Sequence, residues 1–267
     1  MVKQAIMPDR LGTLSSRSGK CWLNRWNRQA RLGSIRNAAN PMIKSIREWP
    51  EGERPREKLL ARGAESLSDA ELLAVLFGQG IRGQDVVSFS RELLLQFGGL
   101  RGILNQQPGA FGSVKGLGIA KSCMLFAVRE IGLRQLREKM IGQNFVRSPQ
   151  AVTDYLMAAL RDQKREIFKV LFLDKALRII SEKDLFFGTI DEAAVHPREI
   201  VKTALEFHAS SLVLVHNHPS GKVEPSREDY EITQKIKAAC QTVSIRVLDH
   251  IIIGENQYFS FSERNSL

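Results

Sequence analysis

The chain has 267 residues, 43% of them hydrophobic and 25% charged, a composition typical of a packed globular protein that argues against disorder throughout. Its net charge of +10, taken alone, suggests a nucleic-acid binder, while its three separated cysteines indicate neither a disulfide framework nor a cysteine-based zinc site. No stretch approaches the roughly 18 to 20 apolar residues of a membrane span or resembles the apolar core of a secretory signal, so we expect a cytoplasmic protein without a membrane partner.

The excess of basic residues lies at the N-terminus. Residues 1–47 hold ten basic side chains and the single acid Asp9, a balance of +9, which leaves 29 basic and 28 acidic residues elsewhere. Charge runs without hydrophobic periodicity are typical of disordered arms. We therefore predict that residues 1–41 are a disordered basic extension, dispensable for folding, with Met42 a candidate for the natural start. Any DNA binding by this extension would be nonspecific.

Residues 42–138 are predicted to form a small all-helical domain. The clearest helix start is Ser68, because Glu71 three residues later can complete a capping box, and the apolar residues that follow end at Gly78. A second helix is predicted over 86–97, where apolar residues recur at helical spacing before two glycines, and a short third helix over 100–104.

The segment 114–121 resembles a helix-hairpin-helix motif and leads into a long predicted helix. In such hairpins glycines let the backbone approach a phosphate, whose charge is met by amide groups at the start of the next helix and by a nearby lysine. Gly116, Gly118 and Lys121 occupy those positions, so DNA is a candidate partner of the helical domain and the basic extension. The alternative is a Gly-x-Gly corner that only joins two helices.

After a predicted linker, 139–147, the hydrophobic period changes and a second domain is predicted over 148–267. Strands alternate with helices, which predicts a three-layer α/β domain with a sheet between helices and a ligand site beyond the strand ends. The continuously apolar run 212–215 is typical of a buried central strand. The other predicted strands are 168–173, 178–187, 245–253 and 257–261, and the predicted helices are 149–161, 197–209 and 226–240.

The predicted central strand leads into two histidines, His216 and His218, which are two residues apart and therefore project to one face. Asp229 follows in the first turn of the next predicted helix. Two histidines and one carboxylate form a common catalytic zinc set that leaves a fourth position for water, so we predict a Zn²⁺ site on these three residues. A helix cap formed by Ser226 and Asp229 is an alternative explanation of that pair, but it does not explain the histidines.

The spacing His216-x-His218, seven residues, Ser226, two residues, Asp229 matches the JAMM signature. Together with the Pro-Ser-Gly turn after the second histidine and the helical block before it, this makes the chain resemble the bacterial RadC family over residues 42–267. The resemblance implies an α/β fold of MPN (JAMM) type, a mixed sheet with flanking helices, preceded by a small helix-hairpin-helix-like domain. It also implies zinc on His216, His218 and Asp229, with Ser226 helping to bind water or the developing oxyanion.

The JAMM pattern further contains a glutamate at the start of an earlier strand, which acts as general base toward water. Glu166 leads directly into the first predicted strand and is the preferred candidate, with Glu182 and Glu199 as rivals. Glu199 lies at a predicted helix start, where the helix dipole alone favours an acid. His250, in a late strand, is either a core histidine or a hydrogen-bond partner of a metal-bound histidine.

Three functions compete at this point. A zinc-dependent hydrolase of JAMM type, acting on an amide or isopeptide bond of an unknown protein or peptide, comes first. The alternative is a DNA-associated repair or recombination factor whose zinc domain is accessory, in line with the traditional label of the RadC family. A zinc nuclease would need carboxylates for a second metal, and this chain has none near the motif beyond Glu224 and Glu228. MPN scaffold proteins lack the metal ligands that this chain has.

Overall fold

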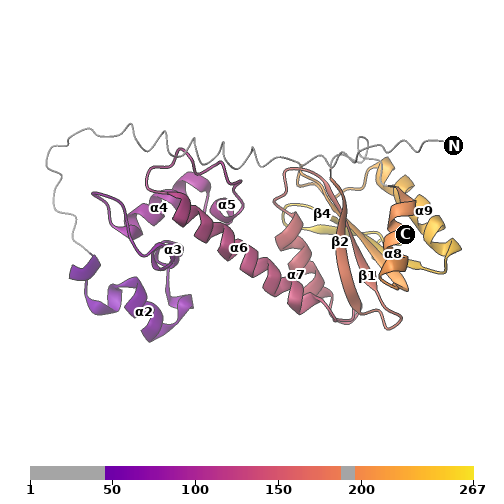
Figure 1. The fold of residues 1–267 in the computed structure, drawn as a ribbon, viewed down its shortest axis with the longest axis horizontal. Helices are drawn as coiled ribbons and strands as arrows, with labels where there is room; N and C mark the ends of the chain where they lie inside the picture. Colours follow the sequence, from indigo (N-terminus) through magenta and orange to yellow (C-terminus); the bar gives the residue numbers. More distant parts are fainter. Residues whose placement is uncertain (1–45, 188–195) are drawn as a thin grey trace, which may run out of the picture. The chain divides into compact units, whose positions relative to one another are not determined.

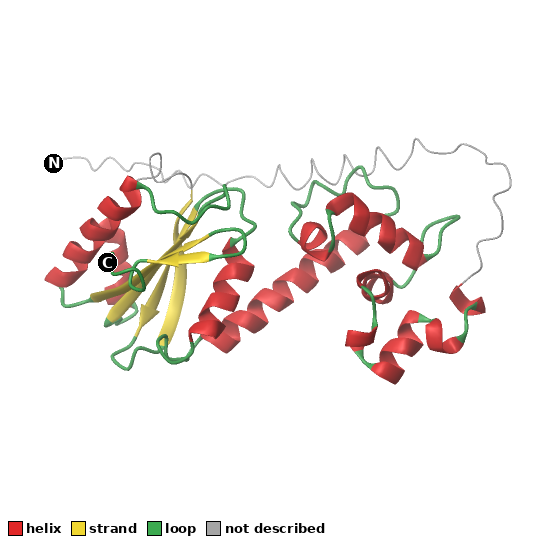
Figure 2. Cartoon of the chain, turned by 180° about the vertical axis from the view of Figure 1, so that it is seen from behind, coloured by secondary structure: helices red, strands yellow, loops and turns green. Residues whose placement is uncertain are grey.

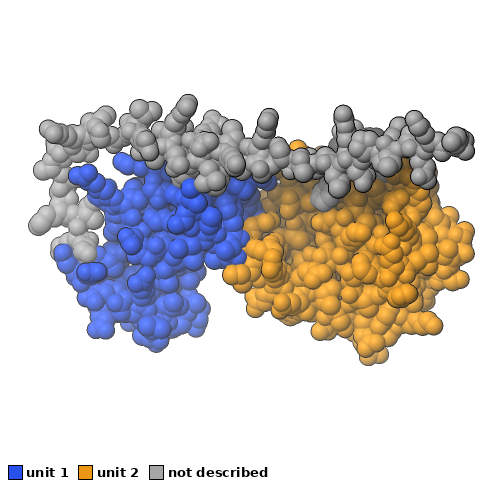
Figure 3. Space-filling model, viewed as in Figure 1, with its two compact units in different colours: residues 1–128 blue, residues 129–267 orange. Residues whose placement is uncertain are grey.

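The computed structural model of the chain describes residues 46–187 and 196–267. The chain forms two compact units that divide between Val128 and Arg129, inside one long helix (Figure 3). The predicted basic extension, 1–41, and Met42 lie outside the described residues. Within the described ranges, no helix is both long enough and apolar enough to cross a membrane.

The N-terminal unit is all-helical in its described part, as predicted. Ser68 and Glu71 form the expected capping box, in which Glu71 N donates to Ser68 Oγ at 3.4 Å and Ser68 N donates to Glu71 Oε2 at 2.8 Å. Phe111 is fully buried in the apolar core of this unit. The elements are η1 (Ile46–Glu48), η2 (Glu51–Glu53), α2 (Pro55–Arg62), η3 (Ala64–Ser66), α3 (Asp69–Phe77), α4 (Val86–Phe97), α5 (Leu100–Leu104) and the first part of α6 (Ile119–Met140).

The segment predicted as a linker, 139–147, packs into the second unit. Helix α6 continues to Met140, which is fully buried in the core of that unit. Gly142 N donates to Ile179 O at 2.8 Å, and Ile179 N donates to Gln143 O at 3.0 Å. The glycine and polar residues that suggested a linker therefore form a tight turn that pairs with the start of a strand.

The second unit is a five-stranded mixed sheet with helices on both faces (Figures 1 and 2), which confirms the predicted fold. The strand order is β2-β1-β3-β4-β5, and of these neighbours only β3 and β4 are parallel. The strands are β1 (Ile167–Leu173), β2 (Ile179–Phe187), β3 (Ser211–Asn217), β4 (Arg246–Ile253) and β5 (Tyr258–Ser260). The helices are α7 (Pro149–Leu160), α8 (Pro197–Glu206) and α9 (Arg227–Thr242).

Each face of the sheet has its own apolar core, because successive strand residues point to opposite faces. In β3, Leu214 packs with residues of α8 and α9, whereas Val213 and Val215 pack with residues of α7. His216 continues the first series and Asn217 the second. The strand therefore presents a histidine to the α9 layer at the point where the sheet ends.

Candidate metal centre

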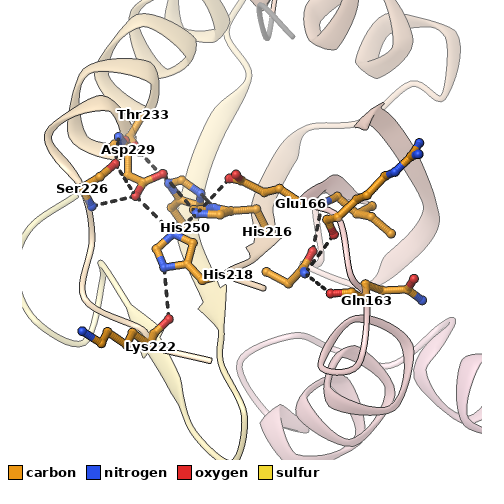
Figure 4. Close-up of polar contacts among 12 residues, drawn as sticks. Gln163, Glu166, His216, His218, Lys222, Ser226, Asp229, Thr233 and His250 are labelled. Atoms are coloured by element: carbon orange, nitrogen blue, oxygen red, sulfur yellow. Dashed lines mark hydrogen bonds and ion pairs between the residues drawn. The ribbon is translucent and has the colours of Figure 1, made fainter. Parts of the chain in front are cut away.

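Four side chains with metal-binding atoms converge at the end of β3 (Figure 4). They come from four places in the fold: Glu166 directly precedes β1, His216 lies in β3, His218 directly follows β3, and Asp229 lies in the first turn of α9. One ligand atom from each lies within 4.8 Å of all the others. The structure thus brings together the three predicted metal ligands and the preferred candidate for the general base.

The spacing of these atoms suits a small metal ion. His216 Nε2 lies 3.0 Å from His218 Nε2 and 3.1 Å from Asp229 Oδ1. His218 Nε2 lies 3.5 Å from Asp229 Oδ2, and Glu166 Oε1 lies 3.8 Å from His216 Nε2. Ligand atoms about 2.0 to 2.2 Å from a tetrahedral zinc ion are separated by about 3.3 Å. The two histidines and the aspartate therefore need little movement to hold such an ion.

The Asp229 carboxylate is fully buried, and only one of its oxygens is hydrogen-bonded. Ser226 donates to Oδ2 from both its backbone N and its Oγ, each at 2.7 Å, whereas Oδ1 has no hydrogen-bond donor among the described residues. A buried carboxylate with an unpartnered oxygen beside two imidazoles fits a cation.

Ser226 is the N-cap of α9. Asp229 N donates to Ser226 Oγ at 3.1 Å, so the two residues form a reciprocal capping box. The helix-cap explanation and the metal-ligand explanation thus apply to the same pair, because the cap orients the carboxylate toward the centre. In this arrangement the Ser226 hydroxyl donates to Asp229, and its role toward water or an oxyanion stays a prediction.

The turn after β3 orients His218. Its Nδ1 lies 3.1 Å from Lys222 O, and because a carbonyl only accepts, Nδ1 carries the ring proton and Nε2 faces the centre (Figure 4). Gly221 N donates to His218 O at 2.9 Å with a φ of +79°, a conformation that favours glycine. The proline and glycine after the second histidine therefore belong to the turn that positions its ring.

Asn217, which the sequence analysis did not single out, connects the ligand-bearing strand to the segment before β1. Its side chain is fully buried on the α7 face of the sheet. Oδ1 accepts from Ile167 N at 2.8 Å, and Nδ2 donates to the carbonyl oxygens of Gln163 and Arg165 at 3.4 and 3.2 Å. These bonds hold the chain on both sides of Glu166. Its place between the two histidines is the one signal in the sequence that could have identified it.

Asn217→Asp is expected to lower the free energy of unfolding by roughly 1 to 3 kcal/mol, because an ionised carboxylate cannot donate to the two carbonyl oxygens that the amide now satisfies. Urea unfolding of the metal-free protein measures this loss. Asn144→Asp is the matched control, since Asn144 also donates to a carbonyl oxygen and accepts from backbone N–H groups, but through hydrogen bonds that are exposed to solvent. Equal losses in the two variants would contradict the special role of Asn217.

The rival glutamates lie outside the four-residue cluster. Glu182, in β2, is bound by Lys169 and by Arg137. Burial opposes its ionisation, but Lys169 together with the hydrogen bonds from Arg137 and Tyr155 lowers the pKa of Glu182. Glu199 lies in the first turn of α8 with its side chain 47% exposed. Of the three candidates for the base, Glu166 is the one beside the metal centre.

The predicted hairpin residues lie in the N-terminal unit. Gly116 has a φ of +85°, and a Cβ there would lie 2.1 Å from Cγ2 of Ile81. The Lys121 ammonium lies 4.5 Å from the ring centroid of Phe89 and donates to Gly80 O at 3.4 Å, and its partial burial lowers the pKa of the amine. These contacts account for Gly116 and Lys121 within the protein, as the corner alternative supposes. Contact between the hairpin and DNA stays a prediction.

Gly116→Ala is expected to destabilise the protein by roughly 1 to 3 kcal/mol, because the methyl group meets Ile81 and the left-handed backbone is unfavourable for alanine. Gly118→Ala is the matched control: a Cβ at Gly118 meets no atom within 4 Å, so the change should stay within about 1 kcal/mol. Thermal or urea unfolding of both variants measures the difference. Equal stability of the two would show that the close approach to Ile81 is unimportant.

Comparison with known proteins agrees with this architecture. Residues 146–266 match the model described as RadC-like JAB domain, and residues 46–123 match the one described as UPF0758 N-terminal. A UPF0758 protein of Aeromonas hydrophila is 51% identical over 223 residues, which cover 84% of this chain and 100% of the relative. One of Thioalkalivibrio sulfidiphilus is 50% identical over 222 residues, covering 83% and 99%.

The mixed sheet and the family match define a RadC-like protein with a JAB (MPN-type) domain behind a helical N-terminal domain. This confirms the resemblance to the RadC family. The chain belongs to the UPF0758 family, whose members align with it over most of its length.

Proposed function

We propose that this protein is a zinc-dependent hydrolase of JAMM type that acts as a peptidase or isopeptidase. The observation that carries the proposal is the buried Asp229 carboxylate, whose Oδ1 has no hydrogen-bond donor among the described residues and lies 3.1 Å from His216 Nε2. A set of two imidazoles and a carboxylate suits Zn²⁺ better than it suits Mg²⁺ or Ca²⁺, which prefer oxygen ligands.

In this proposal His216, His218 and Asp229 hold the metal, and Glu166 acts as the general base and then as the general acid. Zinc, when bound, supplies a Lewis acid that lowers the pKa of water toward about 7 and polarises a substrate carbonyl. Glu166 takes a proton from the attacking water on its carboxylate and delivers it to the leaving amine nitrogen. Asp229 stays ionised throughout, because its cap bonds from Ser226 favour the carboxylate form.

A trapping experiment tests the class of substrate. Glu166→Gln protein loaded with zinc should retain a protein or peptide from a cell lysate, since binding is intact while proton transfer is lost. The double variant Glu166→Gln/His216→Ala is the control and should retain none of that material. Retention of DNA in place of a polypeptide, or equal retention by the double variant, would overturn the proposal.

The strongest support for the DNA-associated alternative is the charge of +9 on residues 1–47. Removal of residues 1–41 deletes eight basic side chains and one acid, so the dependence of DNA affinity on salt should lose most of its slope. Binding titrations of both proteins at several salt concentrations measure this. A steep slope that survives the deletion would place the phosphate contacts in the remainder of the chain and favour the DNA-associated function.

A further inference from the structure

His250 lies directly behind the candidate metal centre (Figure 4). Its Nε2 lies 2.8 Å from Nδ1 of His216, and its Nδ1 lies 2.6 Å from Oγ1 of Thr233. Thr233 lies one turn after Asp229 in α9, and its hydroxyl donates to the Asp229 carbonyl oxygen at 2.5 Å. This chain of contacts therefore starts at one candidate ligand in β3, passes through β4, and ends on the backbone of another candidate ligand in α9.

When His250 is neutral, only one arrangement of protons satisfies every hydrogen bond in this series of contacts. The Thr233 hydroxyl has a single proton, which it donates to the Asp229 carbonyl, so toward His250 it can only accept. Nδ1 of His250 must then carry the ring proton, which leaves its Nε2 as an acceptor for the Nδ1 proton of His216. Nε2 of His216 is consequently unprotonated and presents its lone pair to the centre.

The surroundings of His250 keep its ring neutral. The side chain is fully buried, and its ring centroid lies 4.9 Å from that of Phe261 and 5.8 Å from that of Phe168. Both ring nitrogens already have partners, and neither partner is a carboxylate that would stabilise an imidazolium.

We propose that Thr233 and His250 act together as a tautomer lock that keeps Nε2 of His216 available to a metal ion. The inference rests on the proposed function in taking this centre as a zinc site. A carbonyl or carboxylate behind a metal-bound histidine can only accept, and so needs no such device. The imidazole of His250 can present either a donor or an acceptor at Nε2. Because Thr233 accepts the proton on Nδ1, Nε2 of His250 is the acceptor. Both residues are positioning residues, since the lock acts through His216.

Thr233→Val removes the acceptor with little change in side-chain shape. The proton of His250 then loses its partner on Nδ1 and moves in part to Nε2, where it forces the proton of His216 onto the nitrogen that should bind metal. Zinc affinity, measured by competition with a chromogenic chelator, should fall about 10- to 100-fold. Thr233→Ser keeps the hydroxyl and should stay within about threefold of the wild type. Equal affinity in the valine variant and the wild type would overturn the inference.

Nitrogen-15 spectra of the histidine rings provide a readout that does not depend on zinc. In the wild type, with or without metal, His250 should carry its proton on Nδ1, and in Thr233→Val a signal from the Nε2-protonated form should appear. A wild-type His250 protonated on Nε2 would overturn the lock even if the variants fail to fold. Failure of the proposed function looks different: the wild type would bind no zinc, while His250 would still carry its proton on Nδ1.

Discussion

His216→Ala is expected to abolish stoichiometric zinc binding. The wild type should hold about one zinc ion per chain, because two histidines, one aspartate and water complete a tetrahedron, and the variant should hold less than about 0.1. His216 is fully buried and its Nε2 lies within 3.1 Å of an atom of each of the other two candidate ligands, so its loss removes the ligand that lies between them. Elemental analysis after gel filtration measures the metal content.

His208→Asn is the matched control for this loss. His208 is an exposed histidine of the same unit, in a left-handed backbone conformation with a φ of 53° that asparagine tolerates. It should retain full zinc. Full occupancy in His216→Ala, or an equal loss in His208→Asn, would show that His216 is not a zinc ligand.

Glu166→Gln is expected to keep zinc and stability but to slow hydrolysis of the trapped substrate about 10²- to 10⁴-fold. The glutamine amide is close in shape to the carboxylate, but it cannot take a proton from water at neutral pH. Because Asn217 holds the backbone on both sides of position 166, the change should leave the segment in place. Single-turnover rates and zinc content of the same preparation provide the two measurements.

Glu199→Gln is the control for the choice of base. Its carboxylate lies exposed in the first turn of α8, so its loss should leave turnover close to that of the wild type. The assignment of Glu166 would be wrong if Glu199→Gln abolished turnover while Glu166→Gln did not. Glu182→Gln is less informative, because it removes one of the two carboxylates that pair with the buried Lys169 and is expected to destabilise the sheet.

The amino-acid sequence by itself determined the interactions between residues that lie close together in the chain. The capping boxes of Ser68 with Glu71 and of Ser226 with Asp229 follow from residues three apart, and the helices that they start were predicted close to their observed bounds. The alternation of β3 placed both histidines on one side, because the side-chain period of a strand is two. The prediction of a mixed sheet between helices depended on such periodicities and on the family resemblance.

Contacts between distant segments were decided only by the tertiary structure. The bonds of Asn217 to a segment about fifty residues earlier, and the contact of His250 with Thr233, join residues from different elements and leave no local pattern. The predicted linker packs beside β2 for the same reason, since its partner lies beyond an intervening helix and strand. Side-chain chemistry thus determined which atoms can bind a metal, whereas the pairing of distant strands and helices determined that they meet.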